Sequence, residues 1–114
     1  MYDVIPYPDQ DSALIKDLID KIKKSGNSKN YIDLKRYTNM LGKYGFKMND
    51  MFKKGSYKRL DENLYELRPT NFRIFFTFKN QTFYLLHGFF KKSQETPMQE
   101  IELAKKYIKE IHKK

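Results

Sequence analysis

The chain has 114 residues, with 23 Lys and Arg against 14 Asp and Glu, so its net charge is +9 and its pI is about 9.6. It has no cysteine, which excludes disulfides and thiolate chemistry. The length suits a single domain over residues 1–114, and the charge favours an anionic partner, nucleic acid before an acidic protein. No cationic leader or long apolar run is present, so we expect a cytoplasmic protein without a membrane span.

The N-terminal half predicts a short edge strand followed by a helical hairpin. The strand covers residues 2–6, and two prolines limit its length. Asp9 and Asp11 are candidate caps of a first helix, and a second helix is expected over about residues 29–44. Residues 46–56 are predicted to be a loop. The apolar residues of the first helix fall on one stripe, formed by Leu14, Ile15, Leu18, Ile19 and Ile22.

The C-terminal half predicts four strands and a last helix. The expected strands cover residues 56–60, 64–68, 72–78 and 82–91. In the third strand, Ile74, Phe76 and Phe78 point to one face. The opposite face then carries Arg73, Phe75 and Thr77.

The last helix is predicted from a capping signal. Thr96 can cap a first turn that begins at about Pro97, and Gln99 completes a capping box. The inner stripe of this helix consists of Ile101, Ala104, Ile108 and Ile111. The pattern as a whole predicts an α+β fold with a short first strand, a helical hairpin, a small, antiparallel-rich sheet of four to five strands in total and a C-terminal helix.

The cationic residues of the predicted strands are candidates for binding phosphate. They are Lys58, Arg59, Arg68, Arg73, Lys91 and Lys92, which lie on adjacent strands or at strand ends. Because Arg68 and Arg73 flank one turn, their guanidinium groups can meet the same phosphate. No metal-ligand spacing and no glycine-rich phosphate loop occurs, so we expect neither a metal nor another cofactor.

These residue types suit RNA cleavage without a metal, in which the 2′-hydroxyl attacks the adjacent phosphate. The proton can be removed by a lysine whose pKa neighbouring cations lower, or by Glu66 or His87. Aromatic side chains such as Phe75 and Phe90 are candidates for stacking on a base, beside Arg59 and Lys92 as RNA-binding cations.

A simpler role stays open for each of these residues. Arg73 can be a charged residue on the solvent face of a sheet, and Arg68 can form an ion pair with Glu66. Lys91 and Lys92 can serve to discourage edge pairing at a strand end. His87 can be a hydrogen-bonded histidine of the core.

Three segments resemble the RelE/ParE superfamily of bacterial toxin-antitoxin toxins, and in particular its HigB-like, phage-associated branch. They are ELR at 66–68, FRIFF at 72–76 and LLHGFFKKSQETPMQEIELA at 85–104, and the similarity extends over residues 58–107. The resemblance implies a β-α-α-β-β-β-α order, in which the small sheet packs on the N-terminal helical hairpin and its open face holds a basic cleft. It also implies metal-independent mRNA cleavage in the ribosomal A site and inhibition by an antitoxin, often a helix-turn-helix protein.

The resemblance assigns a role to several positions. Arg73 matches the arginine that contacts the scissile phosphate, Arg68 matches the basic position before it, and Lys91 or Lys92 matches the cations beyond the last strand. The chain departs from the family pattern at Glu66, where a lysine is common, and at residues 96–97, where a tyrosine acts in RelE itself. Two other functions remain open: ParE-like inhibition of DNA gyrase, and non-catalytic regulation through nucleic-acid binding.

Overall fold

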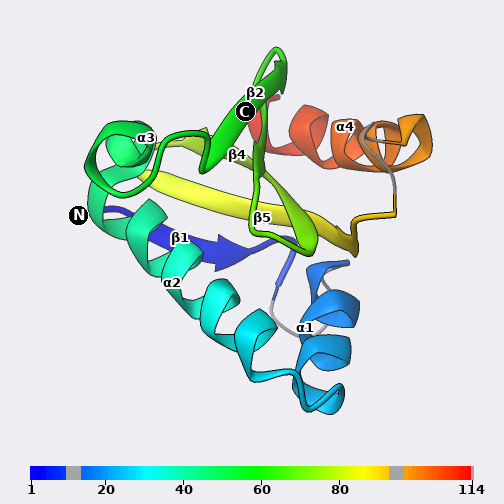
Figure 1. Ribbon diagram of the computed structural model, residues 1–114. Helices are drawn as coiled ribbons and strands as arrows, with labels where there is room; N and C mark the ends of the chain where they lie inside the picture. The colour runs from blue at the N-terminus through cyan, green and yellow to red at the C-terminus, as the bar shows by residue number, and fades with distance from the viewer. Residues whose placement is uncertain (10–13, 93–96, 114) are drawn as a thin grey trace.

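The computed structural model describes residues 1–9, 14–92 and 97–113. Its elements, shown in Figure 1, are β1 (Asp3–Pro6), α1 (Ile15–Lys24), α2 (Ser28–Tyr44), the 3-10 turn η1 (Gly45–Lys47), α3 (Met48–Met51), β2 (Tyr57–Asp61), β3 (Leu64–Leu67), β4 (Phe72–Lys79), β5 (Thr82–Phe90) and α4 (Met98–His112). No helix in these ranges is long and apolar enough to span a membrane.

The helical hairpin and the C-terminal helix are confirmed, with two local differences. Residues 46–56, predicted as a loop, contain part of η1 and all of α3. Pro97 is the N-cap of α4 rather than its first helical residue. The predicted caps Asp11 and Thr96 lie outside the described residues.

The sheet is mixed rather than antiparallel. Its strand order is β1-β5-β4-β3-β2, and β1 lies parallel to β5 at one edge, while the other neighbours are antiparallel. The α1–α2 hairpin is followed by four strands, one more than the order that the resemblance implied. The parallel pair joins residues 3–6 to residues 82–85, which lie far apart in the sequence, so no local turn signal predicts it.

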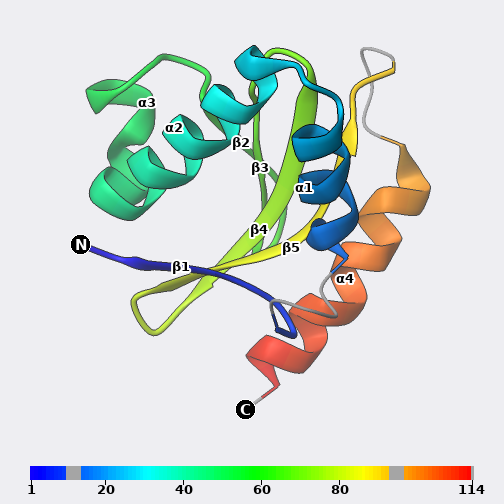
Figure 2. The same cartoon turned by 90° about the horizontal axis from the view of Figure 1, so that it is seen from below.

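Helices cover both faces of the sheet (Figure 2). On one face, α1 and α2 bury residues such as Ile15, Leu18 and Leu41 against Ile74 and Phe76. On the other face, α4 encloses a second cluster that consists of Leu64, Phe75, Leu86, Ala104, Ile108 and Ile111. The expectation of an open sheet face around Arg73 is therefore wrong, because the apolar stripe of α4 is buried on that face.

A bulge in β5 determines which face receives His87. Phe75 pairs with His87 and Phe76 pairs with Leu85, which leaves Leu86 as an extra residue on β5. Leu86 packs in the cluster beneath α4, and the ring of His87 contacts α4 as well. Two consecutive side chains thus point to the α4 face, whereas regular alternation would have turned His87 toward α1.

Beyond the bulge, Gly88 allows α1 to approach the sheet closely. A Cβ atom at this position would lie 2.4 Å from a methyl carbon of Leu18, 2.7 Å from one of Ile15 and 3.2 Å from the carbonyl oxygen of Arg73. Leu18 and Ile15 are buried residues of α1. The absence of a side chain at Gly88 therefore determines how near α1 lies to the end of β5.

We expect Gly88→Ala to lower the free energy of unfolding by about 1–3 kcal/mol, because the added methyl group overpacks the contact with Leu18 and Ile15. Urea denaturation measures the change. Gly42→Ala in α2 is the matched control, since its Cβ would have no contact closer than 3.4 Å and alanine favours a helix. Equal stability of the two variants would contradict the close contact.

The C-terminal end of α4 is attached to β4 by polar contacts. Thr77 Oγ1 lies 2.8 Å from His112 Nε2, and Lys79 Nζ donates to the carbonyl oxygen of Ile111 at 2.9 Å. Burial lowers the pKa of His112 from its ordinary value, and the nearby Lys79 ammonium lowers it further. The folded protein therefore favours the neutral imidazole.

This pKa shift predicts a pH dependence of stability. The unfolded chain binds a proton at His112 at a higher pH than the folded chain does, so the free energy of unfolding should fall as the pH drops below about 6.5. His112→Gln should reduce this fall while leaving the pH dependence above about 7.5 unchanged. Denaturant titrations across this pH range test it, and an unchanged slope in the variant would refute it.

Candidate functional site

A buried carboxylate lies between the two arginines that were predicted to bind phosphate. Glu66 on β3 is 3% exposed, and its Oε1 lies 3.1 Å from Arg73 Nε and 3.7 Å from Arg68 Nε. The ion pair considered for Arg68 is thus present, and Arg73 shares the same partner. A carboxylate at this depth requires compensating charge, which these guanidinium groups supply.

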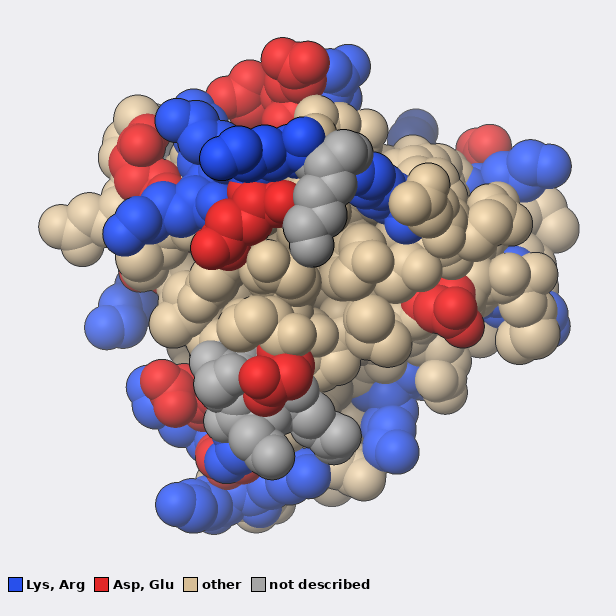
Figure 3. All heavy atoms as spheres, turned by 180° about the vertical axis from the view of Figure 1, so that it is seen from behind, with Lys and Arg blue, Asp and Glu red and all other residues tan. Residues whose placement is uncertain are grey.

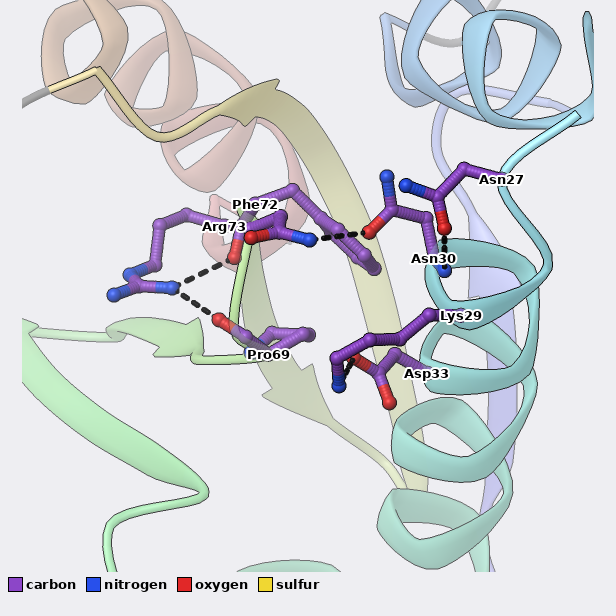
Figure 4. A network of polar contacts seen from close by, with 8 residues as sticks. Asn27, Lys29, Asn30, Asp33, Pro69, Phe72 and Arg73 are labelled. Atoms are coloured by element: carbon purple, nitrogen blue, oxygen red, sulfur yellow. Dashed lines mark hydrogen bonds and ion pairs between the residues drawn. The ribbon is translucent and has the colours of Figure 1, made fainter. Parts of the chain in front are cut away.

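Arg73 also holds the turn between β3 and β4. Its Nη1 donates hydrogen bonds to the carbonyl oxygens of Pro69 and Phe72 (Figure 4). The same turn is attached to α2, because Asn71 Nδ2 donates to Asn30 Oδ1 at 2.9 Å. Burial lowers the pKa of Arg73, while the Glu66 carboxylate partly opposes this shift. Arg73 is therefore a fixed cation, and its placement on an exposed sheet face is wrong.

One cross-strand row connects the edge of the sheet to the candidate histidine. Lys58 pairs with Glu66, Glu66 with Phe75, and Phe75 with His87, on β2, β3, β4 and β5. Lys58 is exposed at the outer end of this row. Phe75 is fully buried beneath α4 and cannot stack on a base, which corrects its predicted role.

His87 forms a side-chain polar contact with Glu100 in the first turn of α4. The His87 Nε2 atom faces Glu100 Oε2, and the two side chains are 14% and 23% exposed. The His87 Nδ1 atom is buried and has no hydrogen-bond partner among the described residues. Glu100 was not predicted as a site residue, although it precedes Ala104 and Ile108 at helical spacing on the inner stripe of α4, where a charge indicates a buried partner.

A pocket of about 410 Å³ lies where the end of β5 meets α1 and the start of α4. Five of the predicted site residues line it: Arg73, His87, Phe90, Lys91 and Lys92. The charged residues that line it and were not predicted are Asp17, Lys21 and Glu100. Lys91 and Lys92 are exposed at its rim, so the pocket combines cations with a protonatable pair.

Other predicted residues lie away from this pocket. Glu66 and Arg68 do not line the pocket. Glu66 contacts Arg73, which lines it, and Arg68 contacts Glu66. Arg59 pairs with Tyr65, whose side chain packs on the α1–α2 side of the sheet. The Nε atom of Arg59 donates a hydrogen bond to the carbonyl oxygen of Asp61. Arg59 therefore belongs to the opposite face of β2 from Lys58.

The positive charge is not gathered into a single patch on the face shown in Figure 3. There, Lys and Arg side chains lie among Asp and Glu at the upper and lower margins, with a band of uncharged residues between them. Within the described ranges, no group of three His, Asp or Glu side chains is arranged to hold a metal ion. The local collection of cations is found at the pocket instead.

The chain matches the family model described as phage derived protein Gp49-like (DUF891) over residues 34–109, two thirds of its length. It therefore belongs to the Gp49-like family, which is associated with RelE/ParE-like toxins of toxin-antitoxin modules. Membership suggests a toxin in general terms and an antitoxin as its partner. No curated protein matches the chain. The matched residues include Glu66, Arg73, His87 and Glu100, but not α1.

Glu66→Gln should lower the free energy of unfolding by about 3 kcal/mol, because Arg73 would stay buried without its counter-charge. Adding Arg73→Met should cost less than the sum of the two single changes, with a coupling of about 1–3 kcal/mol. Urea denaturation of the four proteins in this cycle measures it. Glu62→Gln, at an exposed turn position, is the control and should change stability by no more than about 0.5 kcal/mol.

Additive effects of Glu66→Gln and Arg73→Met would show that the two charges do not depend on each other. The ion pair would then have no part in holding Arg73 at the wall of the pocket.

Proposed function

We propose that this chain is the single-domain toxin of a type II toxin-antitoxin module, similar to HigB, and that it cleaves mRNA on the ribosome without a metal. The observation that carries the proposal is the pocket in which Arg73, Lys91 and Lys92 meet the His87–Glu100 pair. Membership of the Gp49-like family supports it, because that family is associated with toxins of the RNase type.

The cations of the pocket bind the scissile phosphate. Lys91 and Lys92 are exposed and free to follow a phosphate at the rim, while Arg73 presents a fixed guanidinium at the wall. Arg68 has a side chain that is 37% exposed and extends the positive surface beyond Glu66. Such charge-assisted contacts stabilise the additional negative charge of the pentavalent phosphate in the transition state.

The His87–Glu100 pair handles the proton of the attacking 2′-hydroxyl. Glu100 is the more exposed member and lines the pocket, so its carboxylate accepts this proton. His87 Nε2 contacts this carboxylate and stabilises it. The 2′-oxygen then bonds to phosphorus, and the bond to the 5′-oxygen of the next nucleotide breaks. A lysine of the rim gives its proton to that leaving oxygen. Glu66 acts through Arg73 and Arg68 as a positioning residue rather than as the base.

The proposed partners follow from this assignment. The substrate is mRNA in the ribosomal A site, in the cytoplasm, and the rim lysines contact its backbone. A cognate antitoxin, of helix-turn-helix type, inhibits the toxin in resting cells. Both are expectations from family resemblance, supported here by the cationic rim of the pocket.

Replacing both rim lysines by alanine should reduce cleavage roughly 10- to 100-fold, because two charge-assisted contacts to phosphate are lost. Primer extension on translated mRNA after brief expression measures the cuts. Lys53→Ala/Lys54→Ala is the control, since it removes an equally exposed lysine pair that does not line the pocket, and it should cleave like the wild type. Both variants should keep the wild-type melting temperature.

If the wild type arrests growth but the mRNA of these cells stays intact, the proposed mRNA cleavage is refuted. DNA damage signalling in the same cells would then favour a gyrase inhibitor of the ParE type. If the Lys91/Lys92 variant cuts mRNA as strongly as the wild type does, the rim lysines do not belong to the catalytic site.

A further inference from the structure

One wall of the pocket comes from α1, a helix that precedes the family-matched residues 34–109. Asp17 and Lys21 lie four residues apart and therefore share one side of α1. Both line the pocket and both are exposed. The pocket thus receives a carboxylate and an ammonium group that the phosphate chemistry described above does not use.

The position of this wall is defined by packing. Leu18, which lies between Asp17 and Lys21 in sequence, is 2% exposed and packs against Gly88 together with Ile15. Since no Cβ at position 88 separates the two elements, α1 is held directly against the end of β5. Asp17 and Lys21 are therefore carried on a fixed helix, and side chains on a rigid element can discriminate between ligands.

The pair complements guanine better than adenine. Guanine has two adjacent N–H donors on its Watson–Crick edge, N1 and N2, beside the acceptor O6. A carboxylate accepts both donors at once, and a neighbouring ammonium donates to O6. Adenine instead places the donor N6 next to the acceptor N1, so one oxygen of the Asp17 carboxylate would face the lone pair of N1.

The remaining lining fits the rest of a nucleotide. Phe90 is half-buried and borders the pocket, and its ring meets Phe72 edge-to-face, which leaves an aromatic surface for a base. Lys91 and Lys92 follow it directly and can hold the phosphate. A volume of about 410 Å³ lies within the range of small-molecule pockets and accommodates one nucleotide.

We propose that Asp17 and Lys21 form a guanine-reading subsite, which selects the nucleotide on the 5′ side of the cleaved phosphate. The assignment of this nucleotide to a cleavage site rests on the proposed function, whereas the recognition of guanine does not. The subsite makes α1 the specificity element of the pocket, and α4 with the strand ends supplies the chemistry.

The direct test is binding of guanosine 3′-monophosphate and adenosine 3′-monophosphate to the purified chain, followed by NMR titration. The wild type should bind the guanosine nucleotide roughly tenfold more tightly. Asp17→Asn should remove this preference, because an amide cannot accept from both N1 and N2 of guanine, whereas its oxygen and nitrogen suit N6 and N1 of adenine. The affinity for the guanosine nucleotide should fall, and that for the adenosine nucleotide should not.

Asp20→Asn is the matched control. Asp20 lies on the same helix and pairs with Lys16 at 2.9 Å, and it does not line the pocket, so this variant should keep the preference for guanosine. Equal binding of both nucleotides to the wild type would overturn the inference, as would a preference that survives in Asp17→Asn. No measurable binding of either at millimolar concentration would overturn it as well.

Cleavage maps separate this inference from the proposed function. The wild type should cut mainly after guanine, and Asp17→Asn should lose most of the cuts after guanine, so that the remaining cuts show no base preference. A cleavage pattern that is the same in both would refute the subsite and leave the nuclease intact. Preferential guanosine binding by a wild type that cuts no mRNA would refute the nuclease and retain the subsite.

Discussion

The ion pair between Glu66 and Arg73 is the constraint on which the arrangement of the pocket depends. Both side chains are almost completely enclosed, so each charge is tolerable only in the presence of the other. Through it, β3 and β4 are joined on the face that α4 covers, and Arg73 is held where it also secures the turn before β4. A guanidinium fixed in this way is already oriented when a phosphate arrives, so little conformational entropy is lost on binding.

Much of the fold could be predicted because local patterns determine it. The stripe that includes Ile15 and Leu18 predicted α1, and the alternation of Ile74 and Phe76 predicted both the strand and its apolar face. Several residues that line the pocket could also be predicted as candidates, because Lys91 and Lys92 follow an apolar strand directly and Arg73 lies in a recognisable segment. In each case the signal and the structure that it specifies lie within a few residues of each other.

What could not be predicted depends on contacts between distant segments. The alternation of β4 showed that Arg73 and Phe75 share a face, but not that α4 would cover it, so one was expected to be exposed and the other to stack on a base. The parallel pairing of β1 with β5 has no local signature. The sequence assigned no role to Asp17 and Lys21, since only the tertiary packing at Gly88 brings them to the pocket.

The extra residue at Leu86 has a consequence for comparing related chains. Side chains of a strand alternate between the two faces of the sheet, and the bulge interrupts this alternation once, between Leu85 and His87. A relative whose β5 has the same number of residues but pairs regularly with β4, without the bulge, would keep a histidine at the aligned position and yet point it at the opposite layer of the molecule. In this family, a residue of β5 can therefore be given the role of an aligned residue only if the two side chains also point to the same face of the sheet.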